Sequence, residues 1–409
     1  MELVIKKNHE TDKVIALGGN PNVGKSTIFN ELTGLKQHTG NWPGKTVTNA
    51  QGHYTYKENG EKNEYVLVDL PGCYSLMAHS AEEEAARDFI CFGRADAIIV
   101  ICDATCLERG LNLVLQTMEM AEDVIVCINL MDEAKKKKIR IDLQAISERL
   151  GVPVIGTSAR GKKGLDILMR SVKQVIDNKK IQKSDKGKAE KPKSFKVQYP
   201  DYVESAISMV EPHVKYIFEG NGNDATQNII DTRWLSLLLL HWDEGMHGFI
   251  NENLGFDISS DENINSILGE VKENFESKGI TEKQIKDDIV SSLIHAAESI
   301  CKNTIVFENK AYKKKDMRID HILTGKRTAF PIMFLALLAV FWLTITGANY
   351  PSQVISSFLF WIEDKLLTFF VWINAPQFLY EMIVLGVYRV LAWVVSVMLP
   401  PITGFTKCL

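Results

Sequence analysis

The sequence predicts an α/β domain with a mostly parallel sheet and helices on both faces, followed by a small all-α domain and a hydrophobic transmembrane tail. In the first predicted domain, residues 1–178, short apolar runs alternate with amphipathic stretches from Lys13 to about Asn178, which is the rhythm of strands and helices in a βαβ chain. Over residues 200–310 apolar residues recur at helical spacing. From Ala329 onward charged residues become rare and Phe, Trp, Leu, Ile and Val dominate, so this part of the chain suits lipid.

Apolar runs in the first domain indicate strands that are buried on both faces. They are the runs VIALG, YVLVD, AIIVIC, DVIVCIN and VPVIGTS. Leu107–Met120 and Leu143–Leu150 are amphipathic and are predicted to be helices between strands. The Ser-Ala-Glu-Glu sequence at 80–83 predicts the start of another helix, because the Ser and the second Glu can each satisfy a free backbone donor.

Residues 179–199 are rich in Lys, Ser, Asp and Gly and poor in apolar residues, so they are predicted to be a solvated polar linker. The helical domain then covers residues 200–310. Residues 234–240 are apolar but too short to span a bilayer, and they are assigned to the core of this domain. The predicted apolar helix faces are Val203, Ile207, Val210 and Val214, then Ile264, Ile267, Val271 and Phe275, then Ile285, Ile289, Leu293 and Ile300.

Residues 329–348 carry no charge and match the length of about 20 residues that a transmembrane helix needs. The basic segment 311–328 precedes them, and the positive-inside rule places such a flank in the cytosol. Residues 349–381 are predicted to be an interfacial or loop region. Residues 382–405 form a second candidate transmembrane helix, interrupted by Arg389. An Arg within a span is either a functional residue or an unpaired side chain that reaches the interface, and the sequence leaves both open.

The composition excludes some classes of protein. The formal net charge is −4 and the basic residues form no continuous face, which argues against nucleic acid as a partner. The 7 cysteines include no C-x-x-C pair and no partnered histidines at zinc spacing, so a reducing cytosol fits best. The N-terminus lacks the apolar segment of a secretory signal. The first domain is therefore expected in the cytoplasm.

A glycine-rich sequence between the first predicted strand and a helix fits a phosphate-binding loop, G-x-x-x-x-G-K-[ST]. Glycines let backbone N–H groups curl around an anion, and the helix N-terminus adds positive potential. Lys25 is expected to reach the β- and γ-phosphates, and the Ser26 hydroxyl to bind magnesium. The predicted nucleotide contacts in this loop are Gly19, Asn20, Pro21, Asn22, Val23, Gly24, Lys25, Ser26 and Thr27.

Three further motifs follow in the order of a nucleotide site. A strand is closed by Asp69, Leu70, Pro71 and Gly72, where such sites place a magnesium-associated carboxylate and a backbone N–H near the γ-phosphate. The next motif comprises Asn129, Leu130, Met131 and Asp132, and the last comprises Thr157, Ser158 and Ala159. The last motif is expected to supply a backbone contact to the base, and a Thr or Ser there is also a common helix N-cap.

The Asp132 carboxylate can accept hydrogen bonds from two N–H groups of guanine, a pattern that adenine lacks. The site is therefore predicted to select GTP over ATP, and a P-loop ATPase is disfavoured. The usual form of this motif, N-K-x-D, has Lys where this chain has Leu130, so the aliphatic packing on the base remains but the charge is lost. The first domain is thus predicted to be a P-loop GTPase that binds GTP or GDP.

With these motifs in order, the chain resembles the N-terminal part of the bacterial ferrous iron transporter FeoB family. The sequences that carry the resemblance are GNPNVGKS, GNWPGKTVT at 40–48, DLPGCYSL and NLMD, and a helical domain before a membrane helix repeats the family order. The resemblance implies a helical domain that inhibits nucleotide dissociation, ferrous iron transport, and a location in the bacterial cell membrane with the GTPase and helical domains in the cytoplasm.

By this resemblance Thr46 is the switch residue that closes on magnesium and the γ-phosphate, and Asn22 binds potassium together with backbone carbonyls near Gly40 and Trp42. A monovalent cation between the phosphates can neutralise the charge that develops during hydrolysis. Many GTPases carry a water-orienting Gln where this chain has Cys73, so intrinsic hydrolysis is expected to be slow and potassium-stimulated. Catalysis is assigned to Asn22, Lys25, Thr46 and Gly72.

Family members continue through further membrane helices with cysteine-containing gate motifs, which this sequence lacks. Two hypotheses follow. One is the cytosolic and initial membrane part of a ferrous iron transporter, in which GTP hydrolysis regulates or drives uptake. The other is a membrane-anchored regulatory GTPase that does not itself transport iron. The implied partners are guanine nucleotide, the lipid bilayer, ferrous iron, small cytosolic Feo accessory proteins and a further copy of the chain.

Overall fold

The chain forms two compact units, Met1–Asn309 and Lys310–Leu409. The first contains the predicted GTPase and helical domains, and the second contains the predicted membrane segments. The computed structural model describes residues 5–34, 37–42, 47–58, 60–76, 80–93, 95–184, 195–221, 231–240, 261–308, 322–323, 325 and 328–405.

Within the described residues, a mostly parallel 7-stranded sheet forms the centre of the first unit, in the order β2-β3-β4-β1-β5-β6-β8. Strand β1 pairs in parallel with β4 and β5, and β6 and β8 continue the parallel part. Strands β2 and β3 add an antiparallel edge beside β4. Both strands are mostly polar, so the apolar runs of the sequence did not indicate them. The strands are β1 (Lys13–Gly19), β2 (Gln37–Asn41), β3 (Thr48–Glu58), β4 (Glu61–Asp69), β5 (Ala97–Asp103), β6 (Val124–Asn129) and β8 (Val154–Gly156).

Helices cover both faces of this sheet. Alternate residues of β1 point to opposite faces: Val14 and Ala16 belong to the core that includes α2, α3 and α5, whereas Ile15 and Leu17 belong to the core that includes α1 and α6. Helices α3 and α5 have the bounds that the amphipathic pattern predicts. The helices are α1 (Lys25–Thr33), α2 (Ala81–Phe92), α3 (Leu107–Met120), α4 (Met131–Lys136), α5 (Leu143–Leu150) and α6 (Leu165–Ser184), with a 3-10 turn at Ala159–Gly161.

One of the two hydrogen bonds that the capping sequence before α2 predicts is confirmed. The Ser80 side chain accepts a hydrogen bond from the backbone N–H of Glu83 at 3.3 Å. The Ser80 hydroxyl also donates to the Glu83 carboxylate at 3.0 Å, in place of the expected bond from the Ser80 backbone. The cap sets where α2 begins and so fixes the position of its first turn.

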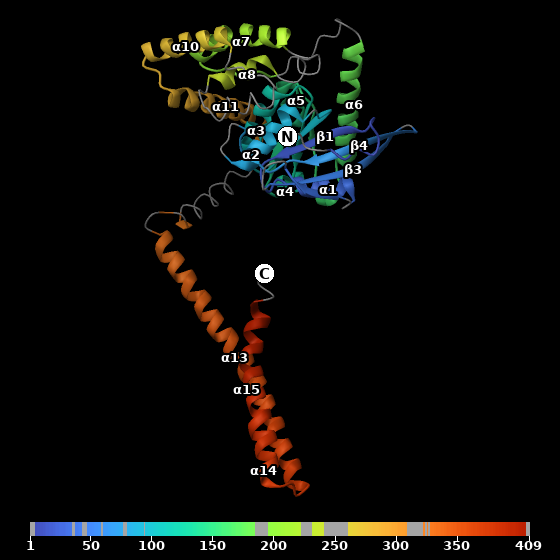
Figure 1. Cartoon of the computed structure of the whole chain (residues 1–409), viewed down its shortest axis with the longest axis vertical. Helices are drawn as coiled ribbons and strands as arrows, with labels where there is room; N and C mark the ends of the chain where they lie inside the picture. The colour runs from blue at the N-terminus through green and yellow to red at the C-terminus, as the bar shows by residue number, and fades with distance from the viewer. Residues whose placement is uncertain are drawn as a thin grey trace. The chain divides into compact units, whose positions relative to one another are not determined.

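The last helix and strand of the helical part pack against the α/β part of the first unit. Helix α11 packs against α3 and α5, and the strand after it, β9 (Ile305–Phe307), pairs antiparallel with β7 (Ile139–Ile141). Residues 234–240 are in the core, as predicted. The helices are α7 (Asp201–Asn221), α8 (Thr232–Leu239), α10 (Glu262–Ser277) and α11 (Glu282–Thr304) (Figure 1).

The predicted linker, residues 179–199, is more structured at both ends than its composition suggests. Helix α6 continues to Ser184. At the other end the backbone N–H of Phe195 donates a hydrogen bond of 2.9 Å to the last residue of α5, and Val197 and Tyr199 are buried. These apolar residues alternate with polar ones, which is a strand-like pattern that average composition conceals. The middle of the linker lies outside the described residues.

In the second unit a long helix, α13 (Ala329–Trp372), is followed by α14 (Gln377–Tyr380), a π-helical stretch (Glu381–Tyr388) and α15 (Arg389–Phe405). Helix α15 runs back along α13 (Figure 1). Helix α13 has 44 residues, so it continues through most of the region expected to be interfacial. Most of the predicted basic segment lies outside the described residues.

One helix in the described part of the chain is long and apolar enough to cross a membrane, Gln377–Met398; Ala329–Trp342 is a shorter apolar helix. Arg389 lies within the longer one and has a partner that the sequence did not reveal. Its Nε and Nη2 atoms are 2.9 and 2.6 Å from Oε1 of Glu363 on α13, and Glu363 is buried. The antiparallel return of α15 brings the two residues together, so Arg389 is not the unpaired side chain that one interpretation expected.

Candidate functional site

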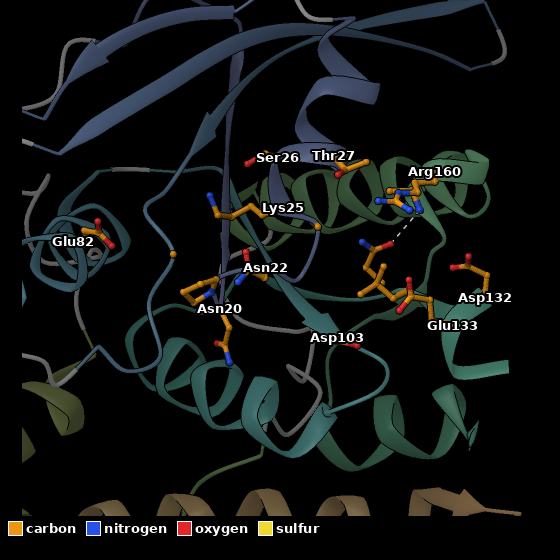
Figure 2. Close-up of a pocket in the computed structure, with 16 residues that line it drawn as sticks. Asn20, Asn22, Lys25, Ser26, Thr27, Glu82, Asp103, Asp132, Glu133 and Arg160 are labelled. Atoms are coloured by element: carbon orange, nitrogen blue, oxygen red, sulfur yellow. Dashed lines mark hydrogen bonds between the residues drawn. The ribbon is translucent and has the colours of Figure 1, made fainter. Parts of the chain in front are cut away.

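A cavity of about 700 Å³ opens at the carboxyl ends of the parallel strands (Figure 2), where open α/β sheets bind their ligands. Residues from all four predicted motifs meet there. The predicted residues that line it are Asn20, Pro21, Asn22, Gly24, Lys25, Ser26, Thr27, Gly72, Asn129, Leu130, Asp132 and Ala159. The other described residues of the motifs are not among the lining residues: Gly19, Val23, Asp69, Leu70, Pro71, Met131, Thr157 and Ser158.

The phosphate loop curls between β1 and α1 because Asn22 (φ 65°) and Gly24 (φ 86°) have left-handed backbone conformations. Glycine adopts such a φ freely, and Asn is among the few other residues that tolerate it. Packing excludes a side chain at both motif glycines: a Cβ on Gly24 would be 2.4 Å from the Asn129 amide, and one on Gly19 would be 2.6 Å from the carbonyl of Ile101. The start of α1 therefore faces the cavity, which suits an anion.

Lys25 stands at the phosphate end of the cavity, and its Nζ is 2.5 Å from Oδ1 of Asp69. The two side chains are only 12% and 15% exposed. Burial raises the pKa of Asp69 above its ordinary value, and the adjacent Lys25 charge opposes this shift. The ion pair joins the first and second motifs. A bound phosphate would compete with Asp69 for the ammonium group of Lys25.

The loop after β4 is held against the phosphate loop. The backbone N–H of Cys73 donates a hydrogen bond of 3.3 Å to the carbonyl of Gly19. Gly72 lines the cavity, and a Cβ on it would be 3.2 Å from Pro21. Burial raises the pKa of the Cys73 thiol to about 12, so the thiol stays protonated at neutral pH and is unsuited to act as a nucleophile.

Asn129 connects three of the motifs through its side chain. Its Nδ2 donates to the carbonyl of Val23 at 3.0 Å, and its Oδ1 accepts from the Thr157 hydroxyl and from the Ala159 backbone N–H, both at 3.1 Å. The side chain is buried. Buried amide groups need such partners, so Asn129 holds the three loops together.

Asp132 lines the opposite end of the cavity, in the first turn of α4. Leu130 (φ 62°) makes the left-handed turn that starts this helix. The Ser158 hydroxyl accepts a hydrogen bond of 3.1 Å from the backbone N–H of Asp132, and the Thr157 carbonyl accepts one of 3.1 Å from Met131. Ser158 makes no side-chain capping bond to the 3-10 turn that follows it. Ser158 thus occupies the N-cap position of the 3-10 turn, one of the positions that the sequence offered, but its hydroxyl bonds the first turn of α4 instead.

Four charged residues that the sequence did not single out also line the cavity: Glu82, Asp103, Glu133 and Arg160. Glu82 lies on the Lys25 side, whereas Glu133 and Arg160 lie on the side of Asp132 (Figure 2). A signal existed for each of them. Asp103 directly follows the predicted strand AIIVIC, Glu133 and Arg160 directly follow motif residues, and Glu82 belongs to the capping sequence of α2.

The switch segment is only partly described. Thr46 lies outside the described residues. Gly40 lies in β2 opposite Asn49. The buried ring of Trp42 packs edge-on against Phe89, with ring centroids 5.5 Å apart. In the described part of the chain, neither Gly40 nor Trp42 is among the residues that line the cavity. The predicted potassium contacts come from backbone carbonyls near these two residues and stay a prediction.

A parallel α/β sheet that gathers a G-x-x-x-x-G-K-S loop, a D-x-x-G turn and an N-x-x-D motif at one edge defines a P-loop GTPase. Residues 13–172 match the family model described as ferrous iron transport protein B, and residues 199–306 match that of the FeoB cytosolic helical domain. The chain belongs to the ferrous iron transport protein B (FeoB) family, whose G domain is a GTPase.

The relatives extend beyond the length of this chain. It is 29% identical over 371 residues to an Fe(2+) transport protein A/Fe(2+) transporter FeoB fusion protein of Porphyromonas gingivalis. It is 27% identical over 343 residues to the Fe(2+) transporter FeoB of Salmonella typhimurium. The two matches cover 90% and 82% of this chain but 41% and 39% of the relatives. The chain thus spans about two fifths of their length.

Solved structures match the first unit. Crystal structures of the cytosolic domain of the T. maritima FeoB iron transporter, in a GDP form and in a GMPPNP form, are both 29% identical to this chain, with a TM-score of 0.55. The matches cover 72% of this chain and 98% and 99% of those structures. The fold of the first unit is therefore one that binds guanine nucleotides in related proteins.

Proposed function

We propose that this chain binds GTP with magnesium in the described cavity, hydrolyses it slowly with the help of potassium, and forms the cytosolic and first membrane part of a ferrous iron transporter. The observation that carries the proposal is the meeting of all four motifs at one cavity. Lys25 and the backbone around Gly24 suit the phosphates, and Gly72 lies beside them. Asp132 suits the guanine base, with Ala159 next to it.

The phosphate end of the cavity fits magnesium. Ser26 presents a hydroxyl there, and Asp69 is a partly buried carboxylate that is paired with Lys25. Magnesium prefers hard oxygen ligands of this kind. When bound with GTP it supplies positive charge against the phosphate oxygens. We assign Ser26, Thr46 and Asp69 to its site.

A potassium site beside the phosphates is proposed at Asn22. The side chain lines the cavity, and the left-handed backbone of the loop sets its position. Its amide oxygen and the backbone carbonyls of Gly40 and Trp42 are oxygen donors suited to a hard monovalent cation. When bound there, potassium supplies positive charge where negative charge grows during hydrolysis.

The transport half of the proposal rests on the relatives and on the second unit. The two relatives described above are named as Fe(2+) transporters, and one of them joins Fe(2+) transport protein A to FeoB in a single chain. This fusion supports a small accessory protein as a partner. The apolar helices Ala329–Trp342 and Gln377–Met398 suit a lipid bilayer. The proposed location is the bacterial cell membrane, with the first unit in the cytoplasm.

Complementation of an iron-uptake-deficient bacterial strain tests this proposal. The strain would express either a relative of full family length or that relative with its corresponding residues replaced by this chain, and ⁵⁵Fe²⁺ accumulation would be measured. Accumulation by the chimaera, and its loss in the chimaera with Lys25→Ala, are the expected results. A chimaera that hydrolyses GTP but accumulates no iron would favour the membrane-anchored regulatory GTPase instead.

A further inference from the structure

The loop that carries Gly72 has a second anchor away from the nucleotide. Gln116, on α3, accepts a hydrogen bond of 2.6 Å from the backbone N–H of Leu76 and one of 3.1 Å from the hydroxyl of Ser75. Its Nε2 donates to Oδ1 of Asn112, one turn earlier on α3, at 3.3 Å. Both polar ends of the Gln116 side chain therefore have partners.

This contact is buried, so it fixes the loop more firmly than a surface bond would. Gln116 is 3% exposed and Leu76 is 1% exposed. A buried backbone N–H that loses its acceptor either moves to another acceptor or stays unsatisfied, which destabilises the folded state. Without the oxygen of Gln116, the loop at Leu76 would have to shift.

Helix α3 supports this contact because it has other packing partners in the first unit. It packs against α11 of the helical part. One turn beyond Gln116, the two carboxylate oxygens of Glu119 lie 2.8 and 2.7 Å from the Tyr199 hydroxyl, whose one hydrogen they share. The loop is thus held at Cys73 by the phosphate loop, through the bond to Gly19, and three residues later by α3.

We propose that Gln116 is a positioning residue for GTP hydrolysis, which fixes residues 73–76 and thereby holds the backbone N–H of Gly72 at the phosphate end of the cavity. This proposal rests on one part of the proposed function, namely that GTP is hydrolysed in this cavity. The N–H of Gly72 is useful only where a γ-phosphate is present. Loss of Gln116 should therefore affect the GTP-bound state and spare the GDP-bound state.

The test compares the 409-residue chain in detergent with its Gln116→Met and Gln116→Glu variants. Met has nearly the length and shape of Gln but lacks the strong acceptor, whereas Glu keeps an acceptor oxygen. For Gln116→Met we expect kcat to fall by about 10-fold to 100-fold, as misplacement of a reacting constellation does, while GDP affinity stays within about twofold of the parent. Gln116→Glu should recover most of kcat.

The matched control is Thr117→Val on the same helix. Thr117 is equally buried, and its hydroxyl donates to the carbonyl of Leu113 within α3, at 2.8 Å. Its kcat should equal that of the parent even where its melting temperature falls as far as that of Gln116→Met. The inference fails if Gln116→Met keeps the parent kcat, if Gln116→Glu gives no recovery, or if Gln116→Met weakens GDP and a GTP analogue equally. A parent chain that does not hydrolyse GTP would instead refute the proposed function.

Discussion

The side-chain amide of Asn129 donates a hydrogen bond of 3.0 Å to the backbone carbonyl of Val23 and so joins the guanine motif to the phosphate loop. The same side chain accepts two hydrogen bonds from the motif that contains Thr157 and Ala159. The base end and the phosphate end of the cavity are thus held at a fixed separation by one buried residue. A nucleotide, which must be contacted at both ends at once, benefits from this preorganisation.

The first prediction concerns this junction. Replacing Asn129 with Ala leaves the partners at Val23, Thr157 and Ala159 without their bonds, and each unsatisfied buried group costs about 1–3 kcal/mol. We expect GDP affinity to fall by about 10-fold to 100-fold, measured by titration with a fluorescent GDP analogue. Thr157→Val removes one of the three bonds and should have a clearly smaller effect. Equal GDP affinity of Asn129→Ala and the parent would contradict this role.

The sequence predicted the parallel strands and the cavity wall well because both depend on local patterns. Continuous apolar runs mark β1, β5 and β6, and each motif follows directly from the end of its strand. Parallel strands bring their carboxyl ends to the same edge. The meeting of Gly24, Asn129 and Ala159 could therefore be predicted without coordinates.

Contacts between segments distant in sequence could not be predicted in this way. The partner of Arg389 is Glu363, on a helix that was expected to be interfacial. Ser158 stands at the start of a 3-10 turn, yet its hydroxyl accepts its hydrogen bond from Asp132 in α4. Gln116 lies within a helix that the pattern predicted well, yet its acceptor role depends on the path of a loop some 40 residues earlier. Side-chain partners of this kind follow from tertiary packing, which periodicity does not encode.

The second prediction concerns the choice of base. Asp132 lines the cavity in the first turn of α4, and a site that hydrogen-bonds a polar edge rejects an analogue lacking it much more strongly than an apolar pocket can. In Asp132→Ala we expect the preference for GTP over ATP to fall by about 100-fold or more, measured as the ratio of kcat/KM values.

Glu133→Gln is the matched control for Asp132, because it removes the neighbouring carboxylate that lines the same cavity. It should leave the GTP preference within about threefold of the parent. If Asp132→Ala still discriminated GTP from ATP as the parent does, the assignment of Asp132 to the base would be wrong.

The third prediction concerns potassium. Asn22 has a left-handed backbone (φ 65°), so Asn22→Gly removes the side chain without the backbone strain that Ala would add. The parent should hydrolyse GTP faster in potassium than in sodium at equal ionic strength, and Asn22→Gly should bring the two rates close together. Equal rates in the parent would remove the basis for a potassium site, and unchanged stimulation in Asn22→Gly would place that site elsewhere.

The fourth prediction concerns pH and the junction between α3 and the chain that enters the helical part. Burial raises the pKa of Glu119 to about 7, although the hydrogen bond from Tyr199 and the charge of Arg233 oppose the shift. Between the ordinary glutamate pKa and pH 7, the folded chain keeps a proton that the unfolded chain releases. This group therefore contributes stability at low pH that is lost as the pH rises through about 7.

Glu119→Gln tests this linkage, because Gln accepts the hydrogen bond from Tyr199 but does not ionise. The parent should lose on the order of 2 kcal/mol from this group between pH 5 and pH 8. The variant should lose less, so that its melting temperature changes less than that of the parent between these two pH values. Glu148→Gln, at an exposed position on α5, is the control for the Glu-to-Gln change itself. Parallel profiles for the parent and Glu119→Gln would show that Glu119 titrates as an ordinary carboxyl group and that its burial does not destabilise the ionised form.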